Sequence, residues 1–112
     1  VEILPRLAEE AKARLARAGF RDVDLRTGDG ARGFSAASFD AIVLTGSTPI
    51  LPDALVAQLK PGGRLFAVVG DPPVMTARLI HYTGPGAWTT DDLFETAVDP
   101  LINAAAPARF TF

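Results

Sequence analysis

Two carboxylates in the sequence stand where an α/β chain could present them to a ligand. Glu2 ends a short apolar opening that predicts a strand, and a carboxylate there can accept hydrogen bonds from both hydroxyls of a ribose. Asp29 lies between Gly28 and Gly30, after the next predicted strand. It could accept a hydrogen bond from the exocyclic amine of an adenine while a neighbouring N–H contacts a ring nitrogen. The two acids therefore indicate a nucleoside site.

Both carboxylates also have simpler explanations, which the residues alone leave open. Glu2 comes just before a predicted helix, where a negative charge interacts favourably with the helix dipole. The Gly-Asp-Gly sequence at residues 28–30 is common in plain turns, and by itself it favours a turn over a binding loop.

Three small residues, Thr-Gly-Ser at positions 45–47, end the most apolar predicted strand. Their size would let a ligand approach the backbone, and a tight loop would require the same residue types. His81 has no serine or cysteine with an orienting acid at a spacing that identifies a catalytic triad. Asp91 and Asp92 are adjacent on a predicted strand and point to opposite faces, so they do not form an acid and base pair.

Hydrophobic periodicity predicts helices that alternate with strands. The predicted helices cover residues 5–18 and 53–59, and the predicted strands cover residues 20–26, 39–45, 64–70, 75–83 and 88–98. Gly19 ends the first helix, and Pro61 with Gly62 fits the centre of a type II turn after the second. The last two strands are joined by a turn at residues 84–86 and should pair antiparallel. The pattern predicts an α/β fold with a mostly parallel, doubly wound sheet.

The remainder of the chain has no clear period from residue 100 onward, and its apolar end, Phe110-Thr111-Phe112, is expected to pack against the fold. At the other end, a predicted helix follows Val1-Glu2-Ile3 almost at once, so the sequence is expected to begin in mid-fold.

Composition narrows the classes of function. A chain of 112 residues with 48% hydrophobic residues is expected to form one small domain. The net charge of -2 comes without a basic run, which disfavours nucleic acid as a partner. No cysteine is present and His81 is the single histidine, so disulfides are excluded, a structural zinc site is disfavoured, and a reducing, cytoplasmic setting is expected. The apolar runs are too short to span a bilayer, so no membrane role is expected.

Several segments, taken in order and spacing, resemble the protein-L-isoaspartate O-methyltransferase family, and the ending resembles a proteobacterial branch of it. These segments are Val1-Glu2-Ile3, Gly28-Asp29-Gly30, Phe39-Asp40-Ala41-Ile42-Val43-Leu44-Thr45, Pro52-Asp53-Ala54-Leu55, Gln58-Leu59-Lys60-Pro61-Gly62-Gly63-Arg64-Leu65, Val69-Gly70, Leu93-Phe94-Glu95-Thr96, Pro100-Leu101-Ile102-Asn103-Ala104 and Arg109-Phe110.

The resemblance implies a Rossmann-like class I methyltransferase sheet. It implies transfer of a methyl group from S-adenosylmethionine to the free carboxyl of isoaspartyl residues in damaged proteins, which repairs them. The residues that it assigns to cofactor binding are Glu2, Ile3, Asp29, Gly30 and Thr45. Positioning of the donor carbon and the carboxylate matters most in such a transfer, so the lack of a catalytic histidine or cysteine is no objection.

Two departures from the family pattern qualify this expectation. The family's first strand, its glycine-rich loop and its substrate-contacting segment should precede Val1, so the chain is expected to be the carboxy-terminal part of one domain, inactive alone, with open sheet edges that could self-associate. Thr45-Gly46-Ser47-Thr48-Pro49 replaces a run of alanines before proline, so this branch could have drifted in substrate.

Two other functions compete with this interpretation. A fragment of a nicotinamide-dependent oxidoreductase would share the acid after the second strand. A cofactor-free Rossmann-like module that pairs through its open edges, as an interaction or dimerisation domain, would explain the missing glycine loop.

Overall fold

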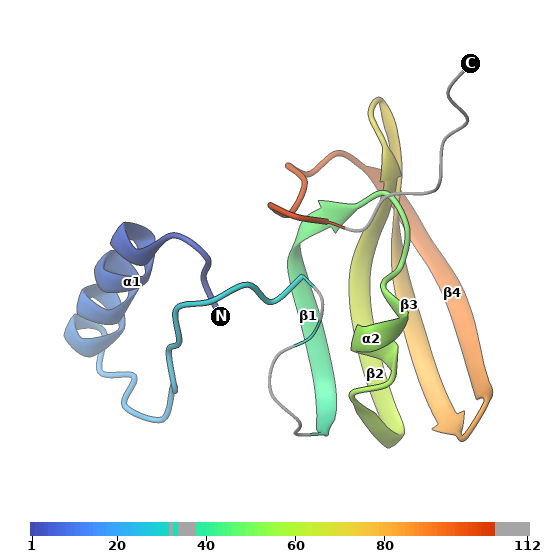
Figure 1. The fold of residues 1–112 in the computed structure, drawn as a ribbon, viewed down its shortest axis with the longest axis horizontal. Helices are drawn as coiled ribbons and strands as arrows, with labels where there is room; N and C mark the ends of the chain where they lie inside the picture. Colours follow the sequence, from blue (N-terminus) through green and yellow to red (C-terminus); the bar gives the residue numbers. More distant parts are fainter. Residues whose placement is uncertain (32, 34–37, 105–112) are drawn as a thin grey trace. The chain divides into compact units, whose positions relative to one another are not determined.

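The computed structural model describes residues 1–31, 33 and 38–104. The chain divides into two compact units, residues 1–30 and residues 31–112. Among the described residues, the first unit contains a helix, and the second contains a four-stranded sheet with a short helix (Figure 1). The predicted packing of the apolar end at residues 110–112 lies outside the described residues.

Helix α1 of the first unit covers Pro5–Arg17, close to its predicted bounds. Pro5 lies in the first turn, where the missing N–H of proline costs no hydrogen bond. Gly19 follows the helix with a φ of 83°, a left-handed conformation that glycine adopts without strain. Arg14 and Arg17 lie in the last turn, where positive charge interacts favourably with the helix dipole. The predicted start and stop signals are confirmed.

The strand predicted at residues 20–26 is wrong, because the structure has no strand there. A single parallel bridge joins Glu2 to Thr27. In it the Glu2 N–H donates to the Arg26 carbonyl at 3.0 Å, and the Gly28 N–H donates to the Glu2 carbonyl at 2.9 Å. Alternating residues form a strand only where a partner runs beside them. The partner segment turns into α1 at Pro5, so the pairing ends after one bridge.

The sheet of the second unit has four strands in the order of the sequence, among the described residues. They are β1 (Phe39–Thr48), β2 (Leu59–Asp71), β3 (Val74–Gly84) and β4 (Ala87–Thr96). Strand β1 runs parallel to β2, and β3 runs antiparallel to both β2 and β4. The α/β class and the antiparallel pair at the carboxy-terminal end are confirmed.

The described sheet is less parallel than predicted, with one parallel pair and two antiparallel pairs. The expected additional parallel strands, at residues 1–3 and 20–26, form the bridge described above instead of a ladder. Strand β1 is therefore an edge strand of the described sheet, and Val43 on it is 65% exposed.

Helix α2 covers Asp53–Val56 and is shorter than the predicted helix at residues 53–59. After Val56 the Gln58 N–H donates to the carbonyl of Leu55, three residues back, at 3.1 Å, which is the bond of a tight turn. Strand β2 then begins at Leu59. Pro61 and Gly62, predicted at the centre of a type II turn, lie within β2 instead, where the pairing with β1 skips from Leu59 to Arg64. Gly62 has a positive φ of 85°, the one feature of such a turn that the structure shows.

Apolar residues cover both faces of the sheet. One face carries the larger cluster, to which α2 contributes Leu55 and where Leu65 and Ile80 are fully buried (Figure 1). The other face carries a smaller cluster of Val68, Met75 and Ala77. Both clusters include residues of β2 and β3, and the larger one also includes Leu44 of β1. The carboxyl end of β1, which carries a predicted site residue, is therefore attached to a packed core.

Candidate functional site

The backbone segments that carry Glu2 and Asp29 lie beside each other in the first unit. Glu2 is hydrogen-bonded through its own N–H and carbonyl to Arg26 and Gly28, so Asp29 follows one residue after the last of these bonds. Gly30 continues beside the start of the chain, since a Cβ at Gly30 would lie 3.6 Å from a methyl carbon of Val1. The structure therefore brings the ends of the two segments side by side, as a shared nucleoside site requires.

The Glu2 side chain also supports the local turn. Its Oε1 accepts a hydrogen bond from the Leu4 N–H at 3.0 Å. Leu4 is the N-cap of α1 and makes no side-chain capping bond of its own. The simpler explanation for Glu2, a carboxylate that supports the helix start, is thus part of its role. One carboxylate oxygen makes this bond, and a carboxylate has further lone pairs that can accept hydrogen bonds from a ligand.

The predicted site residues Ile3 and Thr45 differ in their surroundings. Ile3 is half-buried and lies between the bridge at Glu2 and the start of α1. Thr45 is exposed near the carboxyl end of β1, in the second unit. Since Thr45 belongs to a different unit from the two acids, its place in the site stays a prediction of the sequence.

The small residues after Thr45 are explained by packing within the chain. A Cβ on Gly46 would lie 2.7 Å from Cδ2 of Leu101, so glycine makes room for this side chain. Ser47 is 1% exposed, and its hydroxyl donates to the carbonyl of Val98 at 2.7 Å. At Gly46 and Ser47 the close approach predicted for a ligand is made by the chain itself.

Sequence reasoning missed this contact between β1 and residues 98–101. The signal was present in the two polar or small residues, Gly46 and Ser47, which end an otherwise apolar strand and so imply a nearby backbone. The partner could not be identified because residues from 100 onward show no period.

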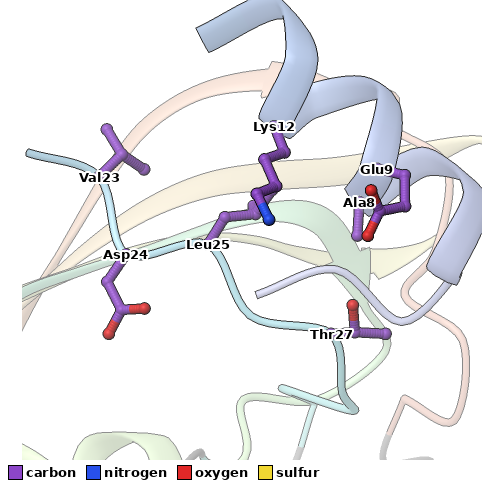
Figure 2. A pocket seen from close by; sticks show the side chains of 7 residues that line it. All are labelled: Ala8, Glu9, Lys12, Val23, Asp24, Leu25 and Thr27. Atoms are coloured by element: carbon purple, nitrogen blue, oxygen red, sulfur yellow. The ribbon is translucent and has the colours of Figure 1, made fainter. Parts of the chain in front are cut away.

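A pocket of ≈ 310 Å³ lies within the first unit, between α1 and residues 23–27 (Figure 2). Its lining mixes apolar side chains with both signs of charge: Ala8, Glu9, Lys12, Val23, Asp24, Leu25 and Thr27. Figure 2 shows Lys12 reaching from α1 towards Leu25, and Asp24 pointing away from the helix. None of the predicted cofactor residues lines this pocket, so the site assignment does not rest on it.

Asp24, which lines this pocket, forms an ion pair with Arg26. Arg26 Nη2 lies 2.8 Å from Asp24 Oδ2, and both side chains are largely exposed. The hydrogen bond from Arg26, followed by its positive charge, lowers the pKa of Asp24 below the ordinary value. The pair joins two residues of the segment that leads to Gly28-Asp29-Gly30.

Of the residues set aside on sequence grounds, His81 is half-buried on β3, and Asp91 and Asp92 are exposed on β4. Asp91 pairs with Leu79 and Asp92 with Arg78, two successive positions that face opposite sides of the sheet. Asp92 accepts a hydrogen bond from Arg78 at 2.9 Å, in an exposed ion pair. The prediction that Asp91 and Asp92 are surface residues on opposite faces is confirmed.

The architecture belongs to a known class of fold. In open α/β sheets, ligands bind outside the carboxyl ends of the parallel strands, where Thr45 lies in this chain.

In the described part of the chain, the helices are too short or too polar to serve as membrane spans.

Comparison with known proteins identifies the family. A protein-family model described as "Protein-L-isoaspartate(D-aspartate) O-methyltransferase (PCMT)" matches residues 1–102. The chain therefore belongs to the protein-L-isoaspartate(D-aspartate) O-methyltransferase family, and the resemblance seen in the sequence is confirmed.

Two curated relatives agree over most of the chain. Protein-L-isoaspartate O-methyltransferase 1 of Anaeromyxobacter sp. is 41% identical over 108 residues, which are 94% of this chain and 51% of the relative. Protein-L-isoaspartate O-methyltransferase of Rhodopseudomonas palustris is 49% identical over 106 residues, which are 93% of this chain and 49% of the relative. The chain thus spans about half the length of these relatives.

Solved structures agree in fold. A structure titled protein-L-isoaspartate O-methyltransferase superposes with a TM-score of 0.79 at 25% identity, over 91% of this chain and 33% of that chain. A second has a TM-score of 0.76 at 19% identity, over 90% of this chain and 50% of that chain. Its title names a beta-aspartate methyltransferase (PCMT) from Plasmodium falciparum in complex with S-adenosyl-L-homocysteine. The Rossmann-like methyltransferase fold is therefore shown.

Proposed function

We propose that residues 1–112 are the carboxy-terminal part of a single methyltransferase domain, which transfers a methyl group from S-adenosylmethionine to the carboxyl of isoaspartyl residues in damaged proteins. The observation that carries the proposal is the pair of backbone bonds from Glu2 to Arg26 and Gly28. In a member of this family, these bonds place the backbone of Glu2 beside the segment that leads to Asp29, which supports a shared adenosine site.

Each site residue has a proposed role toward the cofactor. Glu2 accepts hydrogen bonds from the ribose hydroxyls, and Ile3 contacts the nucleoside beside it. Asp29 accepts from the adenine amine while the N–H of Gly30 donates to a ring nitrogen. Thr45 is proposed to contact the cofactor from the end of β1. The relative whose title names bound S-adenosyl-L-homocysteine supports a nucleoside ligand of this kind.

The chemistry needs positioning more than acid or base catalysis. The cofactor supplies an activated methyl group on a sulfonium. A carboxylate oxygen of the isoaspartyl residue forms a bond to the methyl carbon as the carbon–sulfur bond breaks, which leaves a neutral ester and a neutral thioether. No proton is transferred, so this chain's residues have to bind and orient rather than to exchange protons.

The proposed partners are proteins or peptides that contain isoaspartate. These residues by themselves are expected to be inactive, because they span about half the length of their relatives. A cytoplasmic location and the absence of a nucleic acid partner stay predictions from the composition.

The experiment that tests the proposal measures methyl transfer by the natural protein at its full length. We expect radiolabelled methyl from S-adenosylmethionine to appear on an isoaspartyl peptide and not on the same peptide with a normal aspartyl residue. Residues 1–112 alone serve as the second sample, for which no transfer is expected. Equal labelling of both peptides, or no labelling of either by the full-length protein, would contradict the proposed reaction.

Self-association is a second candidate, and the edge position of β1 favours it. Among the described strands β1 pairs with β2, and a further bridge joins Ser47, near the end of β1, to Pro100. Val43, earlier on β1, is 65% exposed. An apolar edge strand without charges between residues 41 and 46 is a pairing site for another strand.

A further inference from the structure

Residues 98–101, called here the strap, are fixed to the end of β1 by one residue. The Ser47 N–H donates to the carbonyl of Asp99 at 2.8 Å, and the Ser47 carbonyl accepts the N–H of Leu101 at 2.8 Å. The Ser47 hydroxyl adds a third bond, to the carbonyl of Val98, at 2.7 Å. A residue that is 1% exposed thus binds three of the four strap residues.

The strap is also closely packed against the strand that holds it. A Cβ on Gly46 would meet Cδ2 and Cγ of Leu101 at 2.7 and 3.0 Å, and the Leu101 nitrogen at 3.2 Å. The last contact is to backbone, which does not move as a flexible side chain does. Gly46 and Ser47 therefore act together, since one admits the strap and the other binds it.

The strap runs along the edge of the sheet where ligands bind in this class of fold. Strands β1 and β2 are parallel, and Ser47 pairs with Val68 near the carboxyl ends of both. At its other end the strap is held over β3, where the Val98 N–H donates to Met75 Sδ at 3.4 Å. A segment fixed at both ends across the carboxyl edge forms a wall of any site located there.

The exposed chemistry of this wall suits a polypeptide. Pro100 forms a strand-like bridge to Ser47, so the strap is extended there. Asp99 is exposed, and the adjoining Ile102 is 51% exposed. Extended backbone with an apolar side chain beside it is a common way to hold an extended peptide.

We propose that Ser47 is a positioning residue, which fixes the strap as a wall of the binding site for the isoaspartyl peptide. The inference rests on the proposed function and adds a determinant of acceptor binding to it. Ser47 contacts neither substrate nor cofactor in this proposal and acts through the strap.

The test uses Ser47→Ala in the natural protein at full length. We expect the KM for an isoaspartyl peptide to rise by about fivefold, the factor that corresponds to loss of one buried hydrogen bond. The Kd of S-adenosylhomocysteine, measured by titration calorimetry, should change by less than about twofold. Hydrogen exchange at the Leu101 amide should become faster. Gly46→Ala, which pushes on Leu101, should raise the peptide KM in the same way.

A matched control is available one residue further along β1. Thr48 is 0% exposed, and its hydroxyl donates to the carbonyl of Ile50 at 2.6 Å, so it holds the next loop rather than the strap. Thr48→Val removes a buried hydroxyl of the same kind and should leave the peptide KM unchanged. An equal rise in KM for Thr48→Val would show a general loss of stability and overturn the inference.

The two levels of the proposal fail in different ways. A wild-type protein that methylates the isoaspartyl peptide, with the same peptide KM in Ser47→Ala and Gly46→Ala, overturns the inference alone. A wild-type protein that neither binds S-adenosylhomocysteine nor methylates the peptide overturns the proposed function, and the role of Ser47 in acceptor binding with it.

Discussion

Replacement of Glu2 separates its two roles, the support of α1 and the binding of a ribose. Glu2 Oε1 accepts the Leu4 N–H at 3.0 Å, and the N-cap of α1 has no other side-chain capping bond. Glu2→Gln keeps an oxygen that can accept this bond and removes the negative charge. Glu2→Ala removes both the bond and the charge.

The expected magnitudes follow from these contacts. Hydrogen bonds to a charged partner are worth about 1.5–3 kcal/mol, so loss of the Glu2 carboxylate should weaken cofactor binding by roughly 1–3 kcal/mol, or about 5- to 150-fold in Kd. The bond to Leu4 is exposed and resembles a helix cap, so Glu2→Ala should also lower the free energy of unfolding by roughly 0.5–1 kcal/mol. Glu2→Gln should leave this free energy within about 0.5 kcal/mol of the wild type.

The assay combines titration calorimetry of S-adenosylhomocysteine with urea denaturation of the full-length protein. Asp29→Asn should weaken binding to a similar extent, because Asp29 is assigned to the adenine amine. Glu9→Gln removes the same charge from α1, outside the predicted site, and serves as the control for net charge. An unchanged Kd in both Glu2→Gln and Asp29→Asn would refute the site, and an equal loss in Glu9→Gln would show a long-range effect of charge.

Two further predictions concern the sheet edge and the response to acid. Val43→Lys places a charge on the exposed edge strand β1, so any dimer of residues 1–112 should dissociate in this variant. Analytical sedimentation measures the dimer. A wild-type chain that is monomeric at all concentrations would exclude self-association. Arg26 lowers the pKa of Asp24 in the folded protein below its value of about 4 in the unfolded chain. Any contribution of the pair to the free energy of unfolding is therefore present above about pH 4 and is lost as the pH falls through the pKa of the folded state. Asp24→Asn and Arg26→Gln should each flatten the fall of Tm below about pH 4, and an identical acid limb in the wild type and both variants would contradict the assignment.

Much of the fold could be predicted from short-range patterns. The strand at residues 39–45 is apolar on both faces, and β1 covers it with three further residues at its end. The last two predicted strands and the turn between them correspond to β3 and β4. These elements were predictable because alternation and turn residues act over a few positions along the chain.

The errors arose where a segment depends on a distant partner. Residues 20–26 have the alternation of a strand, yet none of them is assigned to one, and the single bridge is formed by the next residue, Thr27. Helix α2 ends at Val56, because the chain enters β2 at Leu59 and pairs there with β1. Neither partner can be found from the local sequence, because hydrogen bonds between remote segments depend on which backbones meet in space.

The candidate site was likewise predictable only in part. The sequence made Glu2 and Asp29 candidates, through their places after predicted strands and the resemblance to the family, and their role in binding stays a prediction. Their juxtaposition required the bonds of Glu2 to Arg26 and Gly28, which only the folded chain shows.

The sequence by itself indicated the family, through the order and spacing of its motifs. It also determined the helix ends at Pro5 and Gly19, because the backbone restrictions at proline and glycine operate locally. Only the tertiary structure identified the hydrogen-bond partner of Ser47, whose hydroxyl donates to a carbonyl fifty-one residues away. The physical reason is that a buried hydroxyl needs a partner, but its residue type does not specify which distant backbone group supplies it.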